Sequence, residues 1–222
     1  MSLEADLERA RDLSVAELAD AIESIGFECT RCGGCCKAVE PSDGDGGREE
    51  HTATVFPDEV RDLQETGDYD WRDVARPMPY GVEETADGPA GETFEWALQT
   101  DACGDCTFYT EGEASETPHG DGEAVGADGP GACTVYEDRP LICRTYPFSV
   151  VLADADEDPE TDDGAALAQP MGAAVDRAVP VRAHECEGLG REIDREDAED
   201  LAAALKERAG RVKWDGSRAD PA

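Results

Sequence analysis

Residues 29–36 read CTRCGGCC, a C-x2-C-x2-C-C motif that gathers four cysteines in one short segment. Two-residue gaps around Gly33 and Gly34 allow a tight loop to turn its sulfur atoms toward one point, as zinc and iron–sulfur sites require. Neighbouring side chains tend to diverge, so Cys35 and Cys36 need not bind the same metal. The motif therefore predicts a metal site that takes further ligands from elsewhere in the chain.

The remaining cysteines lie at wider spacings, at Cys103, Cys106, Cys133, Cys143 and Cys186. The total of nine is odd, so at least one thiol cannot form an internal disulfide. The amino terminus has no apolar signal-peptide core, and no stretch approaches the roughly 18 apolar residues of a membrane span. We therefore expect a cytoplasmic protein, in which clustered cysteines more often bind metal or react than form disulfides.

The charge balance excludes two classes of partner. The 222 residues include 54 acidic and 19 basic side chains, which gives a formal net charge of −35. Such an excess of carboxylates repels nucleic-acid phosphates and anionic membranes, so we expect neither as a partner. Because carboxylates this dense repel one another until salt screens them, we expect a halophilic protein. A disordered acidic chain is the alternative, and the patterned segments described below argue against it.

Positive charges near the cysteines depart from this balance. Residues 29–39 contain two basic residues and no acid, and Arg139 and Arg144 flank Cys143. Thiolates around a metal carry net negative charge, which nearby cations offset. The local charge therefore supports a metal site.

Apolar periodicity and end signals predict the regular elements. Ser14 and Glu17 fit a capping box at the start of one helix, and Gly26 fits its end. Pro57 and Gly67 fit the two ends of another. The predicted helices cover 3–13, 15–25, 57–67 and 194–210, the predicted strands cover 94–99 and 148–152, and loops are expected at 41–50, 110–132 and 153–164.

We expect an α+β fold, as a small, irregular, cysteine-rich domain nucleated by metal, with flanking helices and few short strands. The expected divisions are an N-terminal helical segment (1–26), a cysteine-cluster domain with acidic loop insertions (27–190) and a C-terminal helix (191–214). Segments with apolar periodicity are scarce for this length, so bound metal is expected to replace part of a core. Removal of the metal should then unfold the chain.

Other chemical signals are weak. The chain has no glycine-rich phosphate loop, no G-x-S-x-G segment and no dinucleotide-binding fingerprint. His51 and His119 are expected in surface loops, whereas His184 and Cys186 could form a mixed ligand pair. Classical nucleotide chemistry is therefore not expected.

Residues 133–148, CTVYEDRPLICRTYPF, make a resemblance specific. Together with the C-x2-C-x2-C-C motif, this segment resembles the YkgJ-like cysteine-cluster family, described as chelating zinc or iron, over roughly residues 27–190. Departures are the additional Cys103 and the long acidic stretch between Cys106 and Cys133. The matching positions are Cys29, Cys32, Cys35 and Cys36; Cys106 to Tyr109; Cys133 to Tyr136; Arg139 and Pro140; Cys143 and Arg144; Tyr146 to Phe148; and Cys186, Gly188 and Gly190.

The resemblance implies metal binding through eight cysteines, with zinc or an iron–sulfur cluster as the cofactor. These are Cys29, Cys32, Cys35, Cys36, Cys106, Cys133, Cys143 and Cys186. Flagellin lysine methylases carry a similar cysteine pattern, which implies an alternative: an iron–sulfur oxidoreductase or a protein-modifying enzyme, with a protein substrate or redox partner. A thiol–disulfide role for Cys103 and Cys106 lacks the βαβ context of thioredoxins. Zinc and iron both accept four thiolates, so the sequence leaves the choice of metal open.

Overall fold

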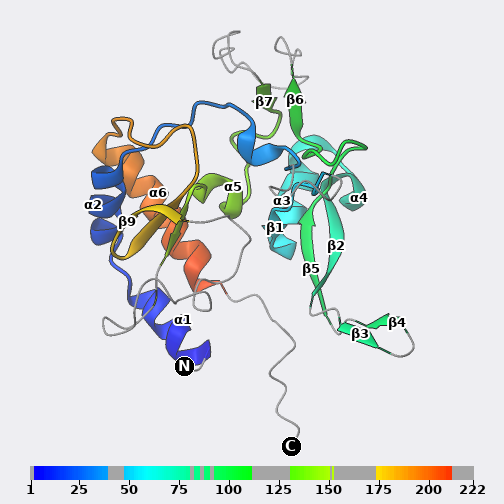
Figure 1. Cartoon of the computed structure of the whole chain (residues 1–222), viewed down its shortest axis with the longest axis horizontal. Coiled ribbons are helices and arrows are strands. Elements are labelled where there is room, and N and C mark those ends of the chain that lie inside the picture. The colour runs from blue at the N-terminus through cyan, green and yellow to red at the C-terminus, as the bar shows by residue number, and fades with distance from the viewer. Residues whose placement is uncertain are drawn as a thin grey trace, which may run out of the picture. The chain divides into compact units, whose positions relative to one another are not determined.

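The computed structural model describes residues 3–39, 48–80, 83–85, 88–90, 93–111, 131–150, 152 and 174–211. Within these residues the chain forms helices and small antiparallel sheets, so the fold class is α+β, as predicted (Figure 1). Of the loop expected at 110–132, residues 112–130 lie outside the described residues, whereas Tyr109–Glu111 and Gly131–Cys133 form paired strands at its two ends. The loop expected at 153–164 and most of the loop expected at 41–50 also lie outside the described residues.

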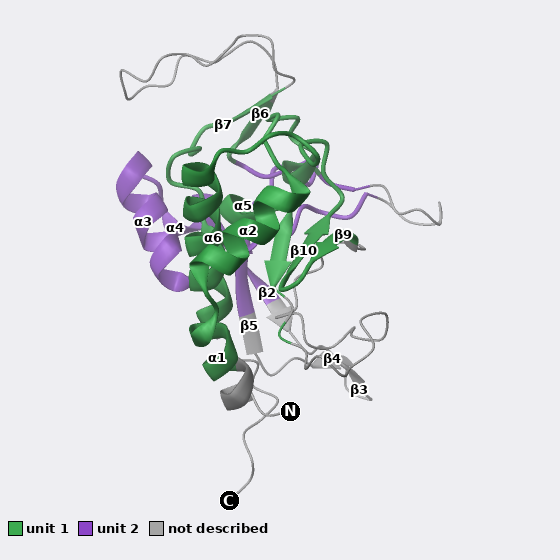
Figure 2. Ribbon diagram, turned by 90° about the vertical axis from the view of Figure 1, so that its left-hand side faces the viewer, with its two compact units in different colours: residues 1–37, 108–211 green, residues 38–107, 212–222 purple. Residues whose placement is uncertain are grey.

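The chain divides into two compact units (Figure 2). The first comprises residues 1–37 and 108–211, and the second comprises residues 38–107 and 212–222. Seven cysteines belong to the first unit, whereas Cys103 and Cys106 belong to the second. Most of the predicted metal ligands therefore lie in the first unit.

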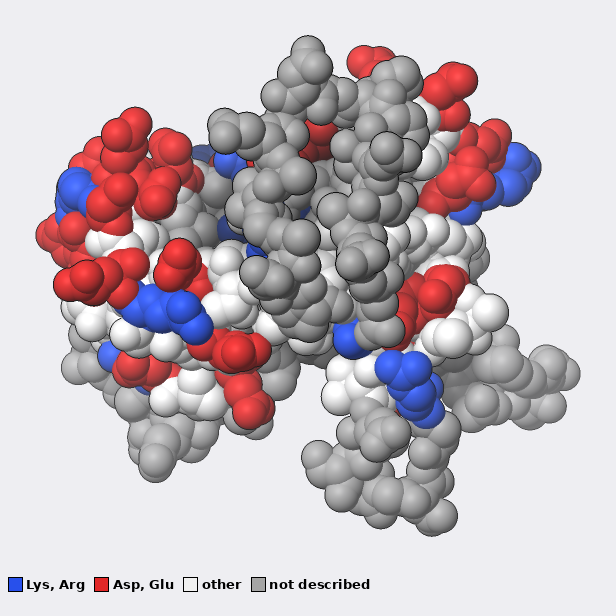
Figure 3. Space-filling view, turned by 90° about the horizontal axis from the view of Figure 1, so that it is seen from above, with Lys and Arg blue, Asp and Glu red and all other residues white. Residues whose placement is uncertain are grey.

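Acidic side chains are spread over the described surface. In Figure 3 they form several separate groups on the face shown, and basic side chains are fewer. This distribution agrees with the sequence, in which the acidic residues behind the formal net charge of −35 are spread along the chain. Within the described residues, no helix combines the length and the apolar character that crossing a bilayer requires.

The first unit contains the N- and C-terminal helices and a three-stranded sheet. Its helices are α1 (Leu3–Asp12), α2 (Val15–Ile25), the 3-10 helix η1 (Gly34–Cys36), α5 (Leu141–Thr145) and α6 (Arg195–Gly210). Its strands are β6 (Tyr109–Glu111), β7 (Gly131–Cys133), β8 (Phe148–Val150), β9 (Ala174–Ala178) and β10 (Val181–His184). The antiparallel sheet has the order β8-β10-β9, and β6 pairs with β7. Helix α6 packs against α1, α2 and α5.

Two helices of this unit, α2 and α6, begin and end close to the positions that the sequence predicts. The Ser14 hydroxyl accepts a hydrogen bond from the backbone N–H of Glu17, and the Asp194 carboxylate accepts one from Asp197 at 2.9 Å. Gly26 ends α2 with a φ of 76°, and a Cβ there would lie 2.5 Å from the carbonyl oxygen of Arg191. Only glycine fits such a left-handed, crowded position without strain. Helix α2 therefore ends just before the first cysteine.

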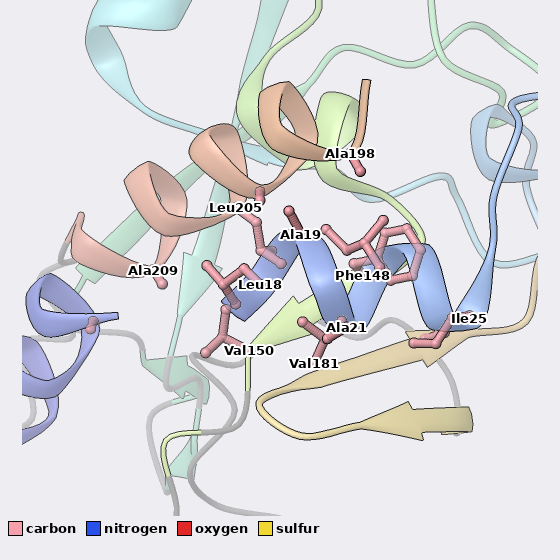
Figure 4. Packing of buried hydrophobic residues seen from close by; sticks show 14 of the residues in the cluster. Leu18, Ala19, Ala21, Ile25, Phe148, Val150, Val181, Ala198, Leu205 and Ala209 are labelled. Carbon is pink, nitrogen blue, oxygen red and sulfur yellow. The ribbon is translucent and has the colours of Figure 1, made fainter. Parts of the chain in front are cut away.

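The first unit has an apolar core between its helices and its sheet. Leu18, Ile22, Phe148, Val181 and Leu205 are at most 1% exposed, and Figure 4 shows the side chains of α2, α6, β8 and β10 meeting there. Much of the core consists of alanines, which carry a weak hydrophobic signal in the sequence. These are Ala10, Ala19, Ala21, Ala183, Ala198, Ala202 and Ala209.

The second unit is built around strand β5. Its elements are β1 (Thr54–Val55), α3 (Pro57–Gly67), α4 (Trp71–Val74), β2 (Ala75–Tyr80), β3 (Glu83–Thr85), β4 (Gly88–Ala90) and β5 (Thr93–Leu98). One sheet has the order β1-β5-β2, and β3 pairs with β4. The ring of Trp71 lies edge-on to that of Trp96, with centroids 5.5 Å apart. The helix predicted at 57–67 and the strand predicted at 94–99 are both confirmed.

Candidate metal centre

The cysteine motif forms a partly exposed loop that ends in the short helix η1. Gly33 precedes η1 with a φ of 74°, and its carbonyl accepts a hydrogen bond from the N–H of Cys36 at 2.9 Å. This turn brings the Sγ atoms of Cys35 and Cys36 to 3.8 Å from each other. Two sulfurs bound to one tetrahedral zinc at 2.3 Å are about 3.8 Å apart. The expected divergence of this pair is therefore wrong, and both thiols can face a single ion.

Cys186 is brought to the motif by backbone pairing between two distant segments. The N–H of Glu28 donates to the carbonyl of Gly188 at 3.1 Å, and the N–H of Gly190 donates to the carbonyl of Gly26 at 3.0 Å. A Cβ at Gly188 would overlap the Glu28 carbonyl oxygen, so this close pairing requires glycine. The segment after Cys186 therefore runs beside the segment before Cys29.

Phe27 holds the start of the motif against the core. Its ring lies edge-on to that of Phe148, with centroids 5.5 Å apart. Aromatic pairs in this arrangement contribute about 0.5–1.5 kcal/mol beyond the area they bury. The cysteine loop thus leaves from a position that is fixed by the apolar core of the first unit.

Cys133 and Cys186 both interact electrostatically with the motif. Burial raises the pKa of the Cys133 thiol, and the charges of Cys35 and Cys29 raise it further. Burial also raises the pKa of Cys186, and Cys35, Cys32 and Cys29 add to that effect. Cys133 and Cys186 therefore share an electrostatic environment with the motif.

Cys35 has the opposite electrostatic environment. A hydrogen bond with Cys36 lowers the pKa of the Cys35 thiol to about 7, against the raising effect of burial, and the charge of Arg139 contributes to the lowering. A thiol with this pKa is partly ionised at neutral pH, and the thiolate is the form that binds metal.

Two arginines contact the ring of Tyr136 beside these thiols. The guanidinium carbons of Arg31 and Arg139 lie 4.1 and 3.7 Å from the ring centroid. Arg139 also donates from Nε to the Tyr136 carbonyl at 2.8 Å, and its charge lowers the pKa of Cys133 as well as that of Cys35. Cation–π contact and the backbone hydrogen bond thus hold positive charge where thiolates would accumulate, as the local charge pattern predicted.

Tyr146 borders the same region. Its hydroxyl donates a hydrogen bond to the carbonyl of Glu185. Burial raises the pKa of Tyr146 to about 12, and the charges of Cys186, Cys35, Glu185 and Cys32 act in the same direction. The phenol is therefore neutral at physiological pH and lies close to the thiols.

The other predicted ligands lie in different surroundings. Cys143 is half-buried on α5 in the first unit, and Cys106 is buried in the second. Cys103 is exposed in a turn where the Asp101 carboxylate accepts hydrogen bonds from the N–H groups of Cys103 and Asp105. No disulfide bond joins any of the nine cysteines.

The structure describes two of the three histidines. Nε2 of His184 lies 2.8 Å from the Ser149 hydroxyl, so this nitrogen already has a hydrogen-bond partner. His51 is half-buried in the second unit, where burial and the charge of Arg76 lower its pKa to about 4. His119 lies outside the described residues.

A comparison with known families identifies the chain. The model of the CxxCxxCC family, described as "Putative zinc- or iron-chelating domain", matches residues 28–169. The chain belongs to this family. The CxxCxxCC match includes the motif, Cys106, Cys133 and Cys143, and it ends before Cys186, which the resemblance in sequence had included. No curated protein and no solved structure matches the chain. Membership of the CxxCxxCC family supports metal binding in general.

The side chains of the first unit fit a soft or borderline metal by their chemistry. Thiolates select zinc, iron–sulfur clusters and similar centres, and arginine beside them offsets their charge. In the part of the chain that the structure describes, no three cysteine, histidine or acidic side chains stand close enough to hold a metal ion in their present positions. Assignment of the CxxCxxCC thiols as ligands is therefore a proposal, which we argue next.

Proposed function

We propose that the protein binds zinc or an iron–sulfur cluster through thiols of its first unit. The central ligands are the cysteines that interact with one another, namely Cys29, Cys32, Cys35, Cys36, Cys133 and Cys186. The resemblance also implies Cys143 of the first unit and Cys106, which lies in the second unit, as ligands. The observation that carries the proposal is the backbone pairing between the segment before Cys29 and the segment after Cys186, which are far apart in the sequence. The electrostatic effects of the motif thiols on Cys133 and Cys186 agree with it.

The chemistry of the region supports a thiolate centre. Burial raises the pKa values of Cys133 and Cys186, and the charges of the motif cysteines raise them further, so thiolates gathered here without a metal would repel one another. A bound cation removes this repulsion and replaces the protons. Arg31 and Arg139 then offset the remaining negative charge of the centre. Both zinc and iron fit this donor set.

The proposal also places the protein in a reducing compartment, with cytoplasm as the expected location. Clustered thiols bind metal only while they are reduced, and the cytosol keeps them in that state. The net charge of −35 makes nucleic acid and anionic membranes unfavourable partners for such a centre.

The test is elemental analysis and visible spectroscopy of protein purified anaerobically in molar salt. A colourless protein with stoichiometric zinc identifies a zinc site, and a brown protein with iron, sulfide and broad visible absorption identifies an iron–sulfur cluster. We expect Cys35→Ser and Cys186→Ser each to lose most of the metal, because each removes a thiolate from the centre.

Cys103→Ser is the matched control, because Cys103 is exposed in the second unit and outside the proposed ligand set. This variant should keep the metal content of the unaltered chain. Wild-type protein that is purified anaerobically without stoichiometric zinc or iron would contradict the proposal, and so would equal loss of metal in Cys35→Ser and Cys103→Ser.

A further inference from the structure

The ring of Tyr109 lies against two buried glycines that come from different segments of the first unit. A Cβ built at Gly33 would overlap Cε2, Cζ and the hydroxyl oxygen of Tyr109, and a Cβ built at Gly131 would overlap the same three atoms. One edge of the ring therefore occupies the space that any side chain at either position would need. Both glycines are buried, so this contact is in the interior of the unit.

Each of these glycines belongs to a segment that carries proposed ligands. Gly33 starts the turn that presents Cys35 and Cys36. Gly131 begins strand β7, which ends at Cys133. The Tyr109 ring thus contacts both the motif loop and the strand that bears a ligand from elsewhere in the chain.

Strand pairing places Tyr109 beside Cys133. The two residues are opposite each other in the antiparallel β6–β7 pair, and opposite residues of such a pair project from the same face. Gly131 lies two residues before Cys133 and shares that face. The ring therefore extends along the face of the Cys133 side chain, across a position kept empty by Gly131, and reaches Gly33.

Lys37 adds a second contact between the motif and this ring. Its Nζ lies 5.2 Å from the centroid of Tyr109, within the range of a cation–π interaction. Lys37 directly follows Cys36, so the loop contacts the ring on both sides of η1. Such contacts restrict how far the loop can move relative to β7.

We propose that Tyr109 is a positioning residue of the metal site, and that its ring sets the separation between Cys133 and the motif cysteines. The inference rests on the proposed function. Loss of the ring would leave the two segments free to separate, because the space between Gly33 and Gly131 would be unfilled. Groups that orient metal ligands typically contribute 10–100-fold to metal affinity.

The test uses Co²⁺ as a probe, added to metal-free protein under anaerobic conditions in molar salt. Thiolate–cobalt charge-transfer absorption reports the number of bound sulfurs, and competition with a chelator gives the affinity. We expect Tyr109→Ala to weaken Co²⁺ binding by about 10–100-fold and to lower the thiolate absorption. Tyr109→Phe keeps the ring and should restore both values close to those of the wild-type chain.

A double-mutant cycle separates positioning from general loosening. If Tyr109 acts through Cys133, Tyr109→Ala should weaken binding far less in a Cys133→Ser background than in the wild-type background. If the two effects simply add, the inference is overturned. Gly131→Ala is a second route to the same state, because the new methyl group displaces the ring while β6 and β7 remain paired, and it too should lower the thiolate absorption.

Tyr69→Ala is the matched control, because Tyr69 also packs on a glycine, Gly67, but in the second unit. We expect wild-type Co²⁺ affinity for this variant, with far-ultraviolet circular dichroism confirming that each variant is folded. Unchanged affinity and absorption in Tyr109→Ala overturn this inference alone. Absence of Co²⁺ binding by the wild-type chain would instead contradict the zinc form of the proposed function.

Discussion

The thiols of the candidate centre differ in the protons they carry before metal binds. Cys133 and Cys186 have raised pKa values, first because they are buried and then because other thiols lie near them. They are therefore protonated at neutral pH. Cys35 has a pKa of about 7, mainly through its hydrogen bond with Cys36, and is partly ionised there. Binding of metal must therefore displace a proton from Cys133 and from Cys186, and only part of a proton on average from Cys35.

We accordingly predict that metal affinity falls as the pH falls. Each proton displaced at a given pH changes the apparent affinity about tenfold per pH unit. Cys133 and Cys186 contribute throughout the neutral range, and Cys35 adds to the slope below about pH 7, where it becomes protonated. Calorimetric titration with zinc, in buffers of different ionisation enthalpy, measures both the affinity and the protons released.

Cys103→Ser is the control for this pH dependence, because Cys103 lies outside the proposed ligand set. The metal affinity of this variant should change with pH as steeply as that of the wild-type chain. An affinity that stays constant between pH 6 and 8 would show that the bound groups are already deprotonated in the free protein.

Among the elements, helices were easier to predict than strands. The ends of α2, α3 and α6 follow from capping residues, prolines and glycines within one turn of each end. Strand β2 was not predicted, because Pro77 and Pro79 argue against a strand. It lies at the edge of its sheet, in the order β1-β5-β2, and an edge strand tolerates residues that cannot donate a ladder hydrogen bond.

Helix α6 is the element on which the core of the first unit most depends, since it packs against three other helices. Leu205 is 1% exposed within that core. We predict that Leu205→Ala lowers the free energy of unfolding by about 2–5 kcal/mol, through lost burial and the cavity left behind. Urea unfolding in molar salt, followed by circular dichroism, measures the change as a shift of the midpoint at constant slope.

Leu201→Ala is the matched control on the same helix, because Leu201 is only partly buried against the core. Its cost should be clearly smaller than that of Leu205→Ala. Equal costs for the two substitutions would show that the α6 face is not packed as described.

Across the whole molecule, electrostatic repulsion opposes the apolar core. The formal net charge is −35. On the face shown in Figure 3, the acidic side chains form several separate groups. The Debye length falls from about 10 Å at 0.1 M salt to about 3 Å at 1 M, so molar salt removes most of the repulsion between separated carboxylates.

We predict that the protein loses helical structure and unfolds at lower temperature when it is dialysed from molar to low salt. Circular dichroism at a helix wavelength, with thermal melting at each salt concentration, measures this change. Sucrose is the control, because it favours compact states by exclusion from the surface and does not screen charge. A spectrum and melting temperature that do not depend on salt would contradict the halophilic interpretation.

The sequence predicted part of the candidate site. The motif predicted clustered thiols, and the structure places the Sγ atoms of Cys35 and Cys36 close together. A common site for the remaining thiols stays a prediction. Adjacency in the sequence had predicted that the side chains of Cys35 and Cys36 point apart. This prediction was wrong, because Gly33 has a left-handed backbone conformation and the η1 turn that follows it brings the two thiols together. The contribution of Tyr109 was missed, since nothing local relates an aromatic ring to glycines in two remote segments.

The amino-acid sequence by itself determined the helix ends, the cysteine motif, the acidic charge and the α+β class. These depend on interactions between residues a few positions apart, or on composition, and both can be read directly. Only the tertiary structure decided that the segment after Cys186 pairs beside Cys29, that Cys133 lies near the motif, and that small alanines build a core. Such contacts join residues separated by a hundred positions or more, and their free energy depends on how whole elements pack.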